Sequence, residues 1–345
     1  MSIKVLTVED STLIRLIINN TIRDMDGVEL IGTAENGAVA IEKIKELKPD
    51  IVTLDVVMPV MDGLETLKIL RKFTDVPVIM LSGISDRRTT IEALENGAQD
   101  FLTKPESITR NKEEFKNDLE VRIKALSGKK IPKKRQNDPI KPKTAKLVKR
   151  ERKSGQKQID AIVIGASTGG PQMLTELVKT LPEDLAIPIF IVQHMPAGFT
   201  ASFARRLDAR SDVNVVEAED GMKIQKGTVY LAPGGLHMVI NRNRIQLLDT
   251  PKVHSVRPAI DPMFKSAIET YGENILAVIL TGMGKDGAEG CVAVKNAGGH
   301  VIAQDEESCV VYGMPKAAVE TGAVDEVLSI YDIIVEINKQ IEGYK

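Results

Sequence analysis

The sequence predicts two α/β domains, each built around a doubly wound parallel sheet and joined by a basic linker. Short apolar segments alternate with amphipathic helical segments in both halves of the chain, which is typical of parallel sheets. The alternation stops at 127–158, where basic residues and prolines gather. The length of 345 residues also exceeds that of one typical domain. We therefore expect domains at 1–126 and 159–345.

Composition excludes several classes of protein. Aromatic residues make up 3% of the chain, which argues against a stacking surface for single-stranded nucleic acid. The net charge of −2 gives the whole chain no affinity for polyanions. Cys291 and Cys309 lack C-x-x-C spacing and lie in apolar contexts, as expected of reduced intracellular thiols. No segment is as long as a membrane span, and the N-terminus is typical of a strand rather than a signal peptide. We expect a soluble, cytoplasmic protein with no direct membrane insertion.

Five strands and five helices alternate in the first half. Strands are expected at 4–8, 29–34, 51–54, 78–81 and 100–102. Helices are expected near 13–23, 38–47, 64–71, 87–96 and 112–126.

Polar residues follow several of these strands. Glu9 and Asp10 follow the first, Asp55 the third, Ser82 the fourth and Lys104 the fifth. Three carboxylates at one sheet edge repel one another unless a cation lies between them, and Mg²⁺ prefers such oxygen ligands. Helix capping would explain a single acidic strand end. Five such residues at four strand ends favour a functional site instead.

The first half resembles response-regulator receiver domains, with a flavodoxin-like fold. The matching motifs are VEDS at 8–11, LDVVMPVMDG at 54–63, LSG at 81–83 and FLTKP at 101–105. The resemblance implies that Asp55 accepts a phosphoryl group from a histidine kinase, and that Glu9, Asp10 and Asp55 hold Mg²⁺. Glu9 stands where many receivers carry aspartate. The resemblance also implies switch roles for Ser82, Phe101 and Lys104.

The segment 127–158 has no sustained periodicity. Twelve Lys/Arg stand against two acidic residues between Lys129 and Lys153, with three interrupting prolines. Such a segment is typical of a flexible, solvated tether. A basic run can also bind nucleic acid, but no helix-turn-helix pattern follows it. We therefore expect no nucleic-acid partner.

The second half begins with a strand, a glycine turn and a helix. Residues 159–171 read IDAIVIGASTGGP, and Ser167 lies in a literal G-x-S-x-G. Glycines on both sides allow a sharp bend and close approach of a substrate to the hydroxyl. The alternative is a serine that caps the following helix.

The same alternation continues to the C-terminus. Strands are expected at 187–193, 275–280 and 300–303, with short β segments within 213–248. Helices are expected near 198–207, 262–269, 288–296 and 331–341.

Ser167, His194 and Asp286 each follow a predicted parallel strand, so three loops at one sheet edge can bring them together. A serine hydroxyl becomes a useful nucleophile when an imidazole takes its proton, and a buried carboxylate orients that imidazole. The chain order Ser, His, Asp differs from that of α/β-hydrolases. His237 and His254 also remain candidates for the base.

Two rival interpretations remain open. Residues 282–287 form a literal G-x-G-x-x-G between a strand and a helix, and Asp305 closes the next strand, as in a dinucleotide-binding oxidoreductase. Against it, Asp286 would direct a negative charge at the pyrophosphate. The other is a receiver-controlled binding module in which Ser167 is only a cap.

The second half resembles the chemotaxis protein-glutamate methylesterases, the CheB family, with a Rossmann-like fold. The matching motifs are IGASTGGP at 164–171, QHMPAGFT at 193–200, YLAPGGLHM at 230–238, VRPAIDPMF at 256–264 and LTGMGKDGAEG at 280–290. The resemblance implies Ser167 as nucleophile, His194 as general base and acid, and Asp286 as its orienting partner. Thr168 and Met283 would lie at the oxyanion site. The implied substrates are glutamate methyl esters on cytoplasmic chemoreceptor helices, with glutamine deamidation as a second activity and no cofactor for the ester chemistry.

Overall fold

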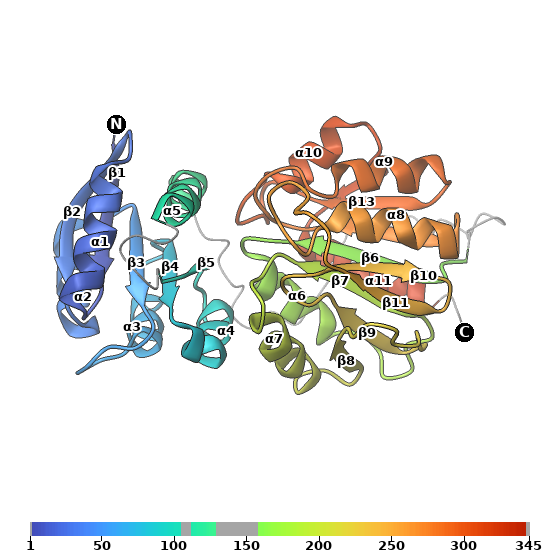
Figure 1. The fold of residues 1–345 in the computed structure, drawn as a ribbon, viewed down its shortest axis with the longest axis horizontal. Helices are drawn as coiled ribbons and strands as arrows, with labels where there is room; N and C mark the ends of the chain where they lie inside the picture. The colour runs from blue at the N-terminus through green and yellow to red at the C-terminus, as the bar shows by residue number, and fades with distance from the viewer. Residues whose placement is uncertain (1, 105–111, 129–157, 343–345) are drawn as a thin grey trace, which may run out of the picture. The chain divides into compact units, whose positions relative to one another are not determined.

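The structure is a computed structural model that describes residues 2–104, 112–128 and 158–342. The chain divides into two compact units, residues 1–131 and 132–345, so the division falls within the predicted linker (Figure 1). The linker prediction at 127–158 lies almost entirely outside the described residues, and the domain bounds 1–126 and 159–345 stay predictions. None of the described helices is long and apolar enough to cross a membrane.

The first unit is a five-stranded sheet whose strands all pair in parallel. In spatial order the strands are β2 (Val28–Ala34), β1 (Ile3–Val8), β3 (Ile51–Asp55), β4 (Val78–Ser82) and β5 (Asp100–Thr103). The helices are α1 (Thr12–Arg23), α2 (Gly37–Leu47), α3 (Gly63–Leu70), α4 (Arg87–Glu95) and α5 (Lys112–Leu126), with a 3-10 turn at Ile84–Asp86. This 2-1-3-4-5 order is flavodoxin-like, as expected.

Polar side chains define where three of these helices begin. Ser11, Asn36 and Asp62 precede α1, α2 and α3, and each accepts a backbone N–H three residues later, at 3.4, 3.0 and 2.8 Å. Each bond satisfies one of the free N–H groups of a first helical turn, typically stabilising the helix by about 1 kcal/mol.

The second unit contains a seven-stranded sheet, also entirely parallel. In spatial order the strands are β14 (Glu326–Leu328), β13 (His300–Gln304), β12 (Ile275–Ile279), β6 (Ala161–Ala166), β7 (Ile189–Gln193), β9 (Thr228–Leu231) and β8 (Asn214–Glu217). The helices are α6 (Gly170–Val178), α7 (Phe199–Asp208), α8 (Ile260–Tyr271), α9 (Ala288–Asn296), α10 (Met314–Glu320) and α11 (Ile330–Glu342). A separate antiparallel hairpin joins β10 (His237–Asn241) to β11 (Arg244–Leu248). The predicted Rossmann-like class is confirmed.

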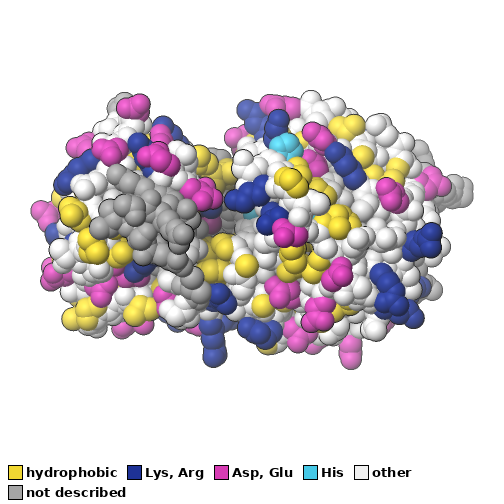
Figure 2. All heavy atoms as spheres, in the orientation of Figure 1, with side chains coloured by type: hydrophobic (Ala, Val, Ile, Leu, Met, Phe, Trp, Pro, Cys, Tyr) yellow, Lys and Arg dark blue, Asp and Glu magenta, His cyan; other side chains and the backbone are white. Residues whose placement is uncertain are grey.

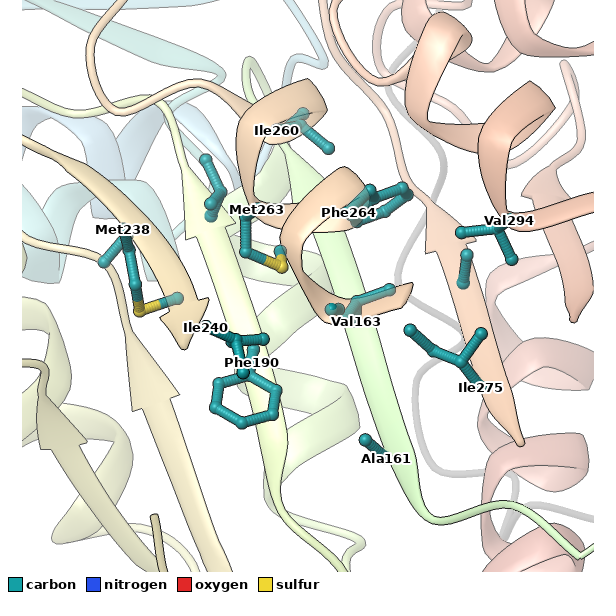
Figure 3. Close-up of a cluster of buried hydrophobic side chains, with 14 of the residues drawn as sticks. Ala161, Val163, Phe190, Met238, Ile240, Ile260, Met263, Phe264, Ile275 and Val294 are labelled. Atoms are coloured by element: carbon teal, nitrogen blue, oxygen red, sulfur yellow. The ribbon is translucent and has the colours of Figure 1, made fainter. Parts of the chain in front are cut away.

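One face of this sheet is covered by α8 and the β10–β11 hairpin (Figure 3). Met263 and Phe264 of α8 pack over Val163 of β6 and Phe190 of β7, and all four are 0% exposed. Complete burial of each such side chain contributes about 1.5–3 kcal/mol. The packing fixes α8 directly above the central strands, which matters because the first turn of α8 reaches the candidate site.

The chain direction across the sheet reverses at the central strand β6. From β6 the chain continues to β7 on one side, and it later returns to β12 on the other. Ligands in open α/β sheets bind at the carboxyl ends of strands at such a reversal. Ser167, His194 and Asp286 follow β6, β7 and β12, three neighbouring strands at this point.

Candidate functional site

The three predicted catalytic residues lie in strand-to-helix loops that share one backbone pattern. Each loop leaves a buried strand and leads, directly or after a few residues, to a glycine with positive φ that begins a helix. These glycines are Gly169 (φ 78°), Gly198 (φ 82°) and Gly287 (φ 90°), before α6, α7 and α9. This backbone conformation strains other residues, so the glycines allow each loop to turn tightly from strand to helix.

Ser167 is held by its backbone. Its N–H donates to Thr281 O at 3.0 Å, and its carbonyl accepts from Gly170 N at 2.8 Å. A Cβ built on Gly282 would lie 2.7 Å from Ser167 Cβ, so the backbone after β12 passes directly beside the serine side chain. Helix α6 is preceded by Gly169 and not by Ser167, so the interpretation of this serine as a helix cap is wrong.

His194 and Asp286 form a hydrogen-bonded pair. The distance from His194 Nε2 to Asp286 Oδ2 is 2.8 Å, and their side chains are 10% and 2% exposed. Asp286 also accepts from the backbone N–H groups of Ile260 (2.7 Å) and Asp261 (3.1 Å). Burial alone would raise the pKa of Asp286, but His194 and these N–H groups hold it below its usual value. The carboxylate is therefore anionic and fixed, and Nδ1 is the imidazole nitrogen left to exchange a proton.

The other histidines have structural partners. His237 is 1% exposed, with Nδ1 accepting from Ala259 N at 3.1 Å and Nε2 lying 3.1 Å from Pro251 O. His254 pairs with Asp261, and His300 pairs with Glu326 at 3.0 Å. Of the three histidines weighed for the base, His194 is the one hydrogen-bonded to Asp286.

Gln193 ties the serine loop to the histidine loop, a role that the sequence analysis missed. Its Nε2 donates to the carbonyl oxygens of Ser167 (3.0 Å) and His194 (3.2 Å). His194 N also donates to Ala166 O at 3.1 Å. Through these contacts the serine and the histidine lie side by side, and none of them joins the hydroxyl to the imidazole. The hydrogen bond between a catalytic hydroxyl and its imidazole is often long in substrate-free enzymes and tightens when substrate binds.

The predicted oxyanion residues border the same loops. Thr168 is 3% exposed, and its carbonyl accepts from Thr281 Oγ1 at 3.0 Å. Met283 is half-buried and follows Gly282, whose backbone contacts Ser167. Both therefore border the Ser167 loop, and their assignment as oxyanion N–H donors stays a prediction.

The rival dinucleotide interpretation conflicts with the geometry. Asp286 points toward the first turn of α8, where it accepts two N–H groups, so it does not line an anion pocket. Asp305 Oδ1 accepts from Ser308 N at 2.9 Å within its own loop, so this oxygen is not available to a ribose.

The first unit brings a second group of predicted residues together. Lys104 Nζ lies 2.6 Å from Asp55 Oδ1 and 3.0 Å from Glu9 Oε2. Burial, with the charge of Asp55, raises the pKa of Glu9 to about 7, and burial also raises the pKa of Asp55. Burial would lower the pKa of Lys104, but both carboxylates raise it. Two carboxylates thus share one ammonium in a dehydrated site.

The other predicted residues of this unit are placed as follows. Asp10 is exposed beside the cluster, and one oxygen from each of Glu9, Asp10 and Asp55 lies within 4.8 Å of the others. The Ser82 hydroxyl is 2.6 Å from Thr90 Oγ1 rather than at the carboxylates. Phe101 is 6% exposed and lies inside the unit. Their switch roles stay predictions.

Residues able to hold a metal occur at two places in the described part of the chain. At the first, Asp55 Oδ2 is buried and has no hydrogen-bond partner among the described residues, so the Glu9–Asp10–Asp55 set fits a divalent cation. The second is His254, Asp261 and Glu289. There the side chains already pair with protein groups, so we assign no metal to it.

Charged side chains of both signs are interspersed on the face of the second unit in Figure 2, with no extended patch of one sign among the described residues drawn there.

Fold and site together define a class of protein: a receiver-type unit with a carboxylate–lysine cluster, followed by an α/β unit with a Ser-His-Asp constellation. Residues 5–116 match the response regulator receiver domain family, and residues 162–337 match the CheB methylesterase family. The chain therefore belongs to the CheB methylesterase family and carries a receiver domain.

Relatives match over almost the whole chain. A Clostridium acetobutylicum protein named protein-glutamate methylesterase/protein-glutamine glutaminase is 44% identical over 99% of both chains. A Pyrococcus horikoshii protein of the same name is 43% identical over 99% of this chain and 94% of its own. The crystal structure of the Thermotoga maritima CheB methylesterase catalytic domain is 46% identical, with a TM-score of 0.51, and covers 54% of this chain and 99% of that one.

Proposed function

We propose that this protein is a phosphorylation-activated serine esterase that hydrolyses glutamate methyl esters on cytoplasmic helices of chemoreceptors. Deamidation of glutamines at the same site would be its second activity. The observation that carries the proposal is the buried His194–Asp286 pair, at 2.8 Å, on the strand end next to Ser167. The names of the relatives support the substrate class.

In the proposed mechanism, Ser167 Oγ attacks the ester carbonyl while His194 Nδ1 takes the hydroxyl proton. Asp286 holds Nε2–H and stabilises the resulting imidazolium. Backbone N–H groups near Thr168 and Met283 receive the developing oxyanion, each worth about 10²–10³ in rate. Collapse of the tetrahedral species breaks the ester C–O bond, and the imidazolium returns the proton to methanol.

Deacylation repeats these steps with water. His194 takes a proton from water as the oxygen attacks the acyl carbon, and the proton returns to Ser167 Oγ as the acyl bond breaks. The products are the glutamate carboxylate and free enzyme. A glutamine side chain would enter the same pathway, with ammonia leaving in place of methanol.

In the receiver, Asp55 is the proposed phosphoacceptor and a histidine kinase of the chemotaxis pathway the donor. Mg²⁺ held by Glu9, Asp10 and Asp55 would neutralise phosphoryl oxygens during transfer. An Asp55 oxygen attacks phosphorus, and the donor imidazole leaves. Lys104, at 2.6 Å from Asp55, would then pair with the acyl phosphate. The Ser82 hydroxyl would exchange Thr90 for a phosphoryl oxygen. With chemoreceptor helices and a histidine kinase as its proposed partners, the protein would act in the cytoplasm.

The test is methanol release from methylated receptor by the wild type and Ser167→Ala. Removal of the nucleophile should lower kcat by at least about 10³-fold, because triad members act as a unit. Ser202→Ala, which removes a hydroxyl from α7, is the matched control and should keep wild-type turnover. A phosphonate probe should label the Ser167 peptide alone.

A Ser167→Ala variant that keeps a tenth of wild-type turnover would remove this serine from the nucleophile role. Titration with nicotinamide cofactor tests the oxidoreductase alternative, for which we expect no binding. If neither methanol release nor cofactor binding occurred, the non-enzymatic binding module would be the better interpretation.

A further inference from the structure

The carboxylate of Asp286 does more than hold His194, because it also caps α8. Its oxygens accept from Ile260 N at 2.7 Å and Asp261 N at 3.1 Å, the first two residues of that helix. The residue directly before α8 is Ala259, which has no side-chain acceptor. Asp286 therefore satisfies N–H groups that the local sequence of α8 leaves without a cap.

Asp261 makes the reciprocal contact, because it caps α9, the helix that follows Asp286. Asp261 belongs to the first turn of α8, and its Oδ1 accepts from Gly290 N at 2.6 Å, in the first turn of α9. Gly287, which precedes α9, has no side chain to cap it. The two aspartates thus cap each other's helices, and the α8 and α9 N-termini are locked together at the strand end.

The two helices are packed too closely for this arrangement to shift freely. A Cβ on Gly290 would lie 2.7 Å from Phe264 Cβ and 3.1 Å from Asp261 Oδ1. Asp261 and Asp286 are both 2% exposed. Burial raises the pKa of Asp261, as does the charge of Asp286, while Gly290 N and His254 lower it. Because both carboxylates are buried, each depends on its N–H donors and its histidine to stabilise its negative charge.

His254 supplies the second histidine. Its Nε2 lies 3.1 Å from Asp261 Oδ2, and its side chain is 23% exposed. His254 and Ser255 both have positive φ, 49° and 65°, and the turn is closed by reciprocal N–H to carbonyl bonds between Val253 and Val256. Residues other than glycine rarely adopt this backbone conformation, and it persists where the surroundings impose it.

We propose that Asp261, held by His254, is a positioning residue that fixes Asp286 against His194 through the reciprocal caps of α8 and α9. This inference rests on the proposed role of Asp286. Without the Asp261 carboxylate, the first turn of α9 loses an acceptor close to Asp286 in the chain. Asp286 is then held less firmly, and the His194 imidazole loses its fixed orientation. A misplacement of about 1 Å at a catalytic group can cost 10²-fold in rate.

The test compares Asp261→Ala with Asp261→Asn in the full chain, assayed by methanol release. We expect Asp261→Ala to lower kcat at least about tenfold with KM changed less than about threefold, since substrate contacts are intact. Asn keeps an oxygen for Gly290 N and offers an amide N–H to His254 Nε2, so Asp261→Asn should recover kcat to within about threefold of wild type. The matched control is Asp325→Asn, another carboxylate that accepts a backbone N–H, from Val301 at 3.0 Å, at the opposite end of the sheet.

A double-mutant cycle separates positioning from general stability. If Asp261 acts through Asp286, adding Asp261→Ala to Asp286→Ala should lower kcat no further. The NMR signal of the His194 ring proton bonded to Asp286 should shift or broaden in Asp261→Ala while remaining in Asp325→Asn. An equal loss of kcat in both backgrounds would overturn the proposal, and so would a wild-type kcat in Asp261→Ala.

If Asp261→Ala does not fold, variants of His254 provide the test. His254 lies in a partly exposed loop, and His254→Ala removes one hydrogen-bond partner of the buried Asp261 carboxylate. We expect at least about threefold lower kcat at unchanged KM. His254→Gln, which restores an N–H donor, should recover it; unchanged kcat in His254→Ala overturns the proposal. The Asp286→Ala variant shows which proposal has failed. If Asp286→Ala keeps wild-type turnover, both the proposed catalytic role of Asp286 and this inference are wrong. If Asp286→Ala is slow and Asp261→Ala has normal turnover, only this inference is wrong.

Discussion

At the scale of single residues, the two units use buried carboxylates in opposite ways. Asp286 receives two backbone N–H groups and an imidazole, and its pKa is lowered despite its burial. Asp55 has one oxygen without a hydrogen-bond partner among the described residues, and burial raises its pKa. These environments agree with the proposed roles: Asp286 as a charged orienting group, and Asp55 as a metal ligand and phosphoacceptor.

The lowered pKa of Asp286 makes a prediction about acid stability. The unfolded chain, with the usual value of 3.8, takes up the proton before the folded chain does. The stabilising contribution of this carboxylate is therefore fully present above about pH 4 and is lost as the pH falls through the lower folded pKa. We expect the advantage of the wild type over Asp286→Asn in urea unfolding to be constant from pH 7 to 5 and to shrink by pH 3. An advantage that does not change with pH would contradict the assignment.

At the scale of elements, close backbone contacts set the geometry of each site. Helix α3 begins against the loop that follows Asp55, the proposed phosphoacceptor. Gly63 N donates to Val56 O at 3.0 Å, and a Cβ on Gly63 would lie 2.0 Å from Asp55 O. The contact is with backbone, so rotation of a side chain cannot relieve it.

Gly63→Ala should therefore destabilise the first unit by about 1–3 kcal/mol and slow phosphorylation of Asp55. Gly32→Ala is the matched control, because its methyl group would meet only side-chain atoms, of Leu47 (2.8 Å) and Leu6 (3.1 Å), which can shift more easily than backbone. Hydrogen exchange of the β1 and β3 amides in the full chain measures the stability. Equal protection in the two variants would mean that the α3 contact does not fix the loop.

Sequence periodicity predicted the central elements well, for a physical reason. Strands β6, β7 and β12 are buried on both faces, so their continuous apolar runs stand out. Helix α10 and strand β14 were missed, since the first has seven residues and the second three, largely exposed ones. Such short elements depend on tertiary contacts more than on local pattern.

The strand ends also predicted the His194–Asp286 pair and the meeting of Glu9, Asp55 and Lys104, but not the position of the Ser82 hydroxyl, and the comparisons confirm the family. The contacts between them were beyond the sequence, because the partners of Gln193, Asp261 and His254 depend on loop geometry. VRPAIDPMF and QHMPAGFT contained these residues without indicating what they bind. The roles of Ser167 and Asp55 stay predictions until tested.

At the scale of the whole molecule, the proposed function requires the receiver to control the esterase. Acetyl phosphate with Mg²⁺ should raise methanol release by the wild type and leave Asp55→Asn unchanged, because asparagine lacks the anionic oxygen that attacks phosphorus. Asp26→Asn, which removes an exposed carboxylate elsewhere in the receiver, should respond like the wild type. Equal stimulation of Asp55→Asn would rule out Asp55 as the phosphoacceptor.

The direction of that control is the last prediction: residues 155–345 alone should be more active than the unphosphorylated full chain. The sequence predicts a flexible tether between the domains, and a short tether gives an effective concentration near the millimolar range. Even weak docking of the receiver over the Ser167 mouth would then exclude a helical receptor for much of the time. A phosphorylation-induced change of 1.4 kcal/mol in docking alters the open-to-closed ratio tenfold.

The measurement is kcat/KM for the fragment and the full chain on the same methylated receptor without a phosphodonor. The fragment is a reasonable unit, since the catalytic domain of the Thermotoga maritima relative has its own crystal structure. Acetyl phosphate should bring the full chain toward the fragment and leave the fragment unaffected, because the fragment lacks Asp55. A correctly folded fragment slower than the unphosphorylated full chain would mean that the receiver only activates. The hypothesis that the docked receiver blocks access to Ser167 would then be wrong, and the phosphorylated receiver would have to act on the geometry of the active site.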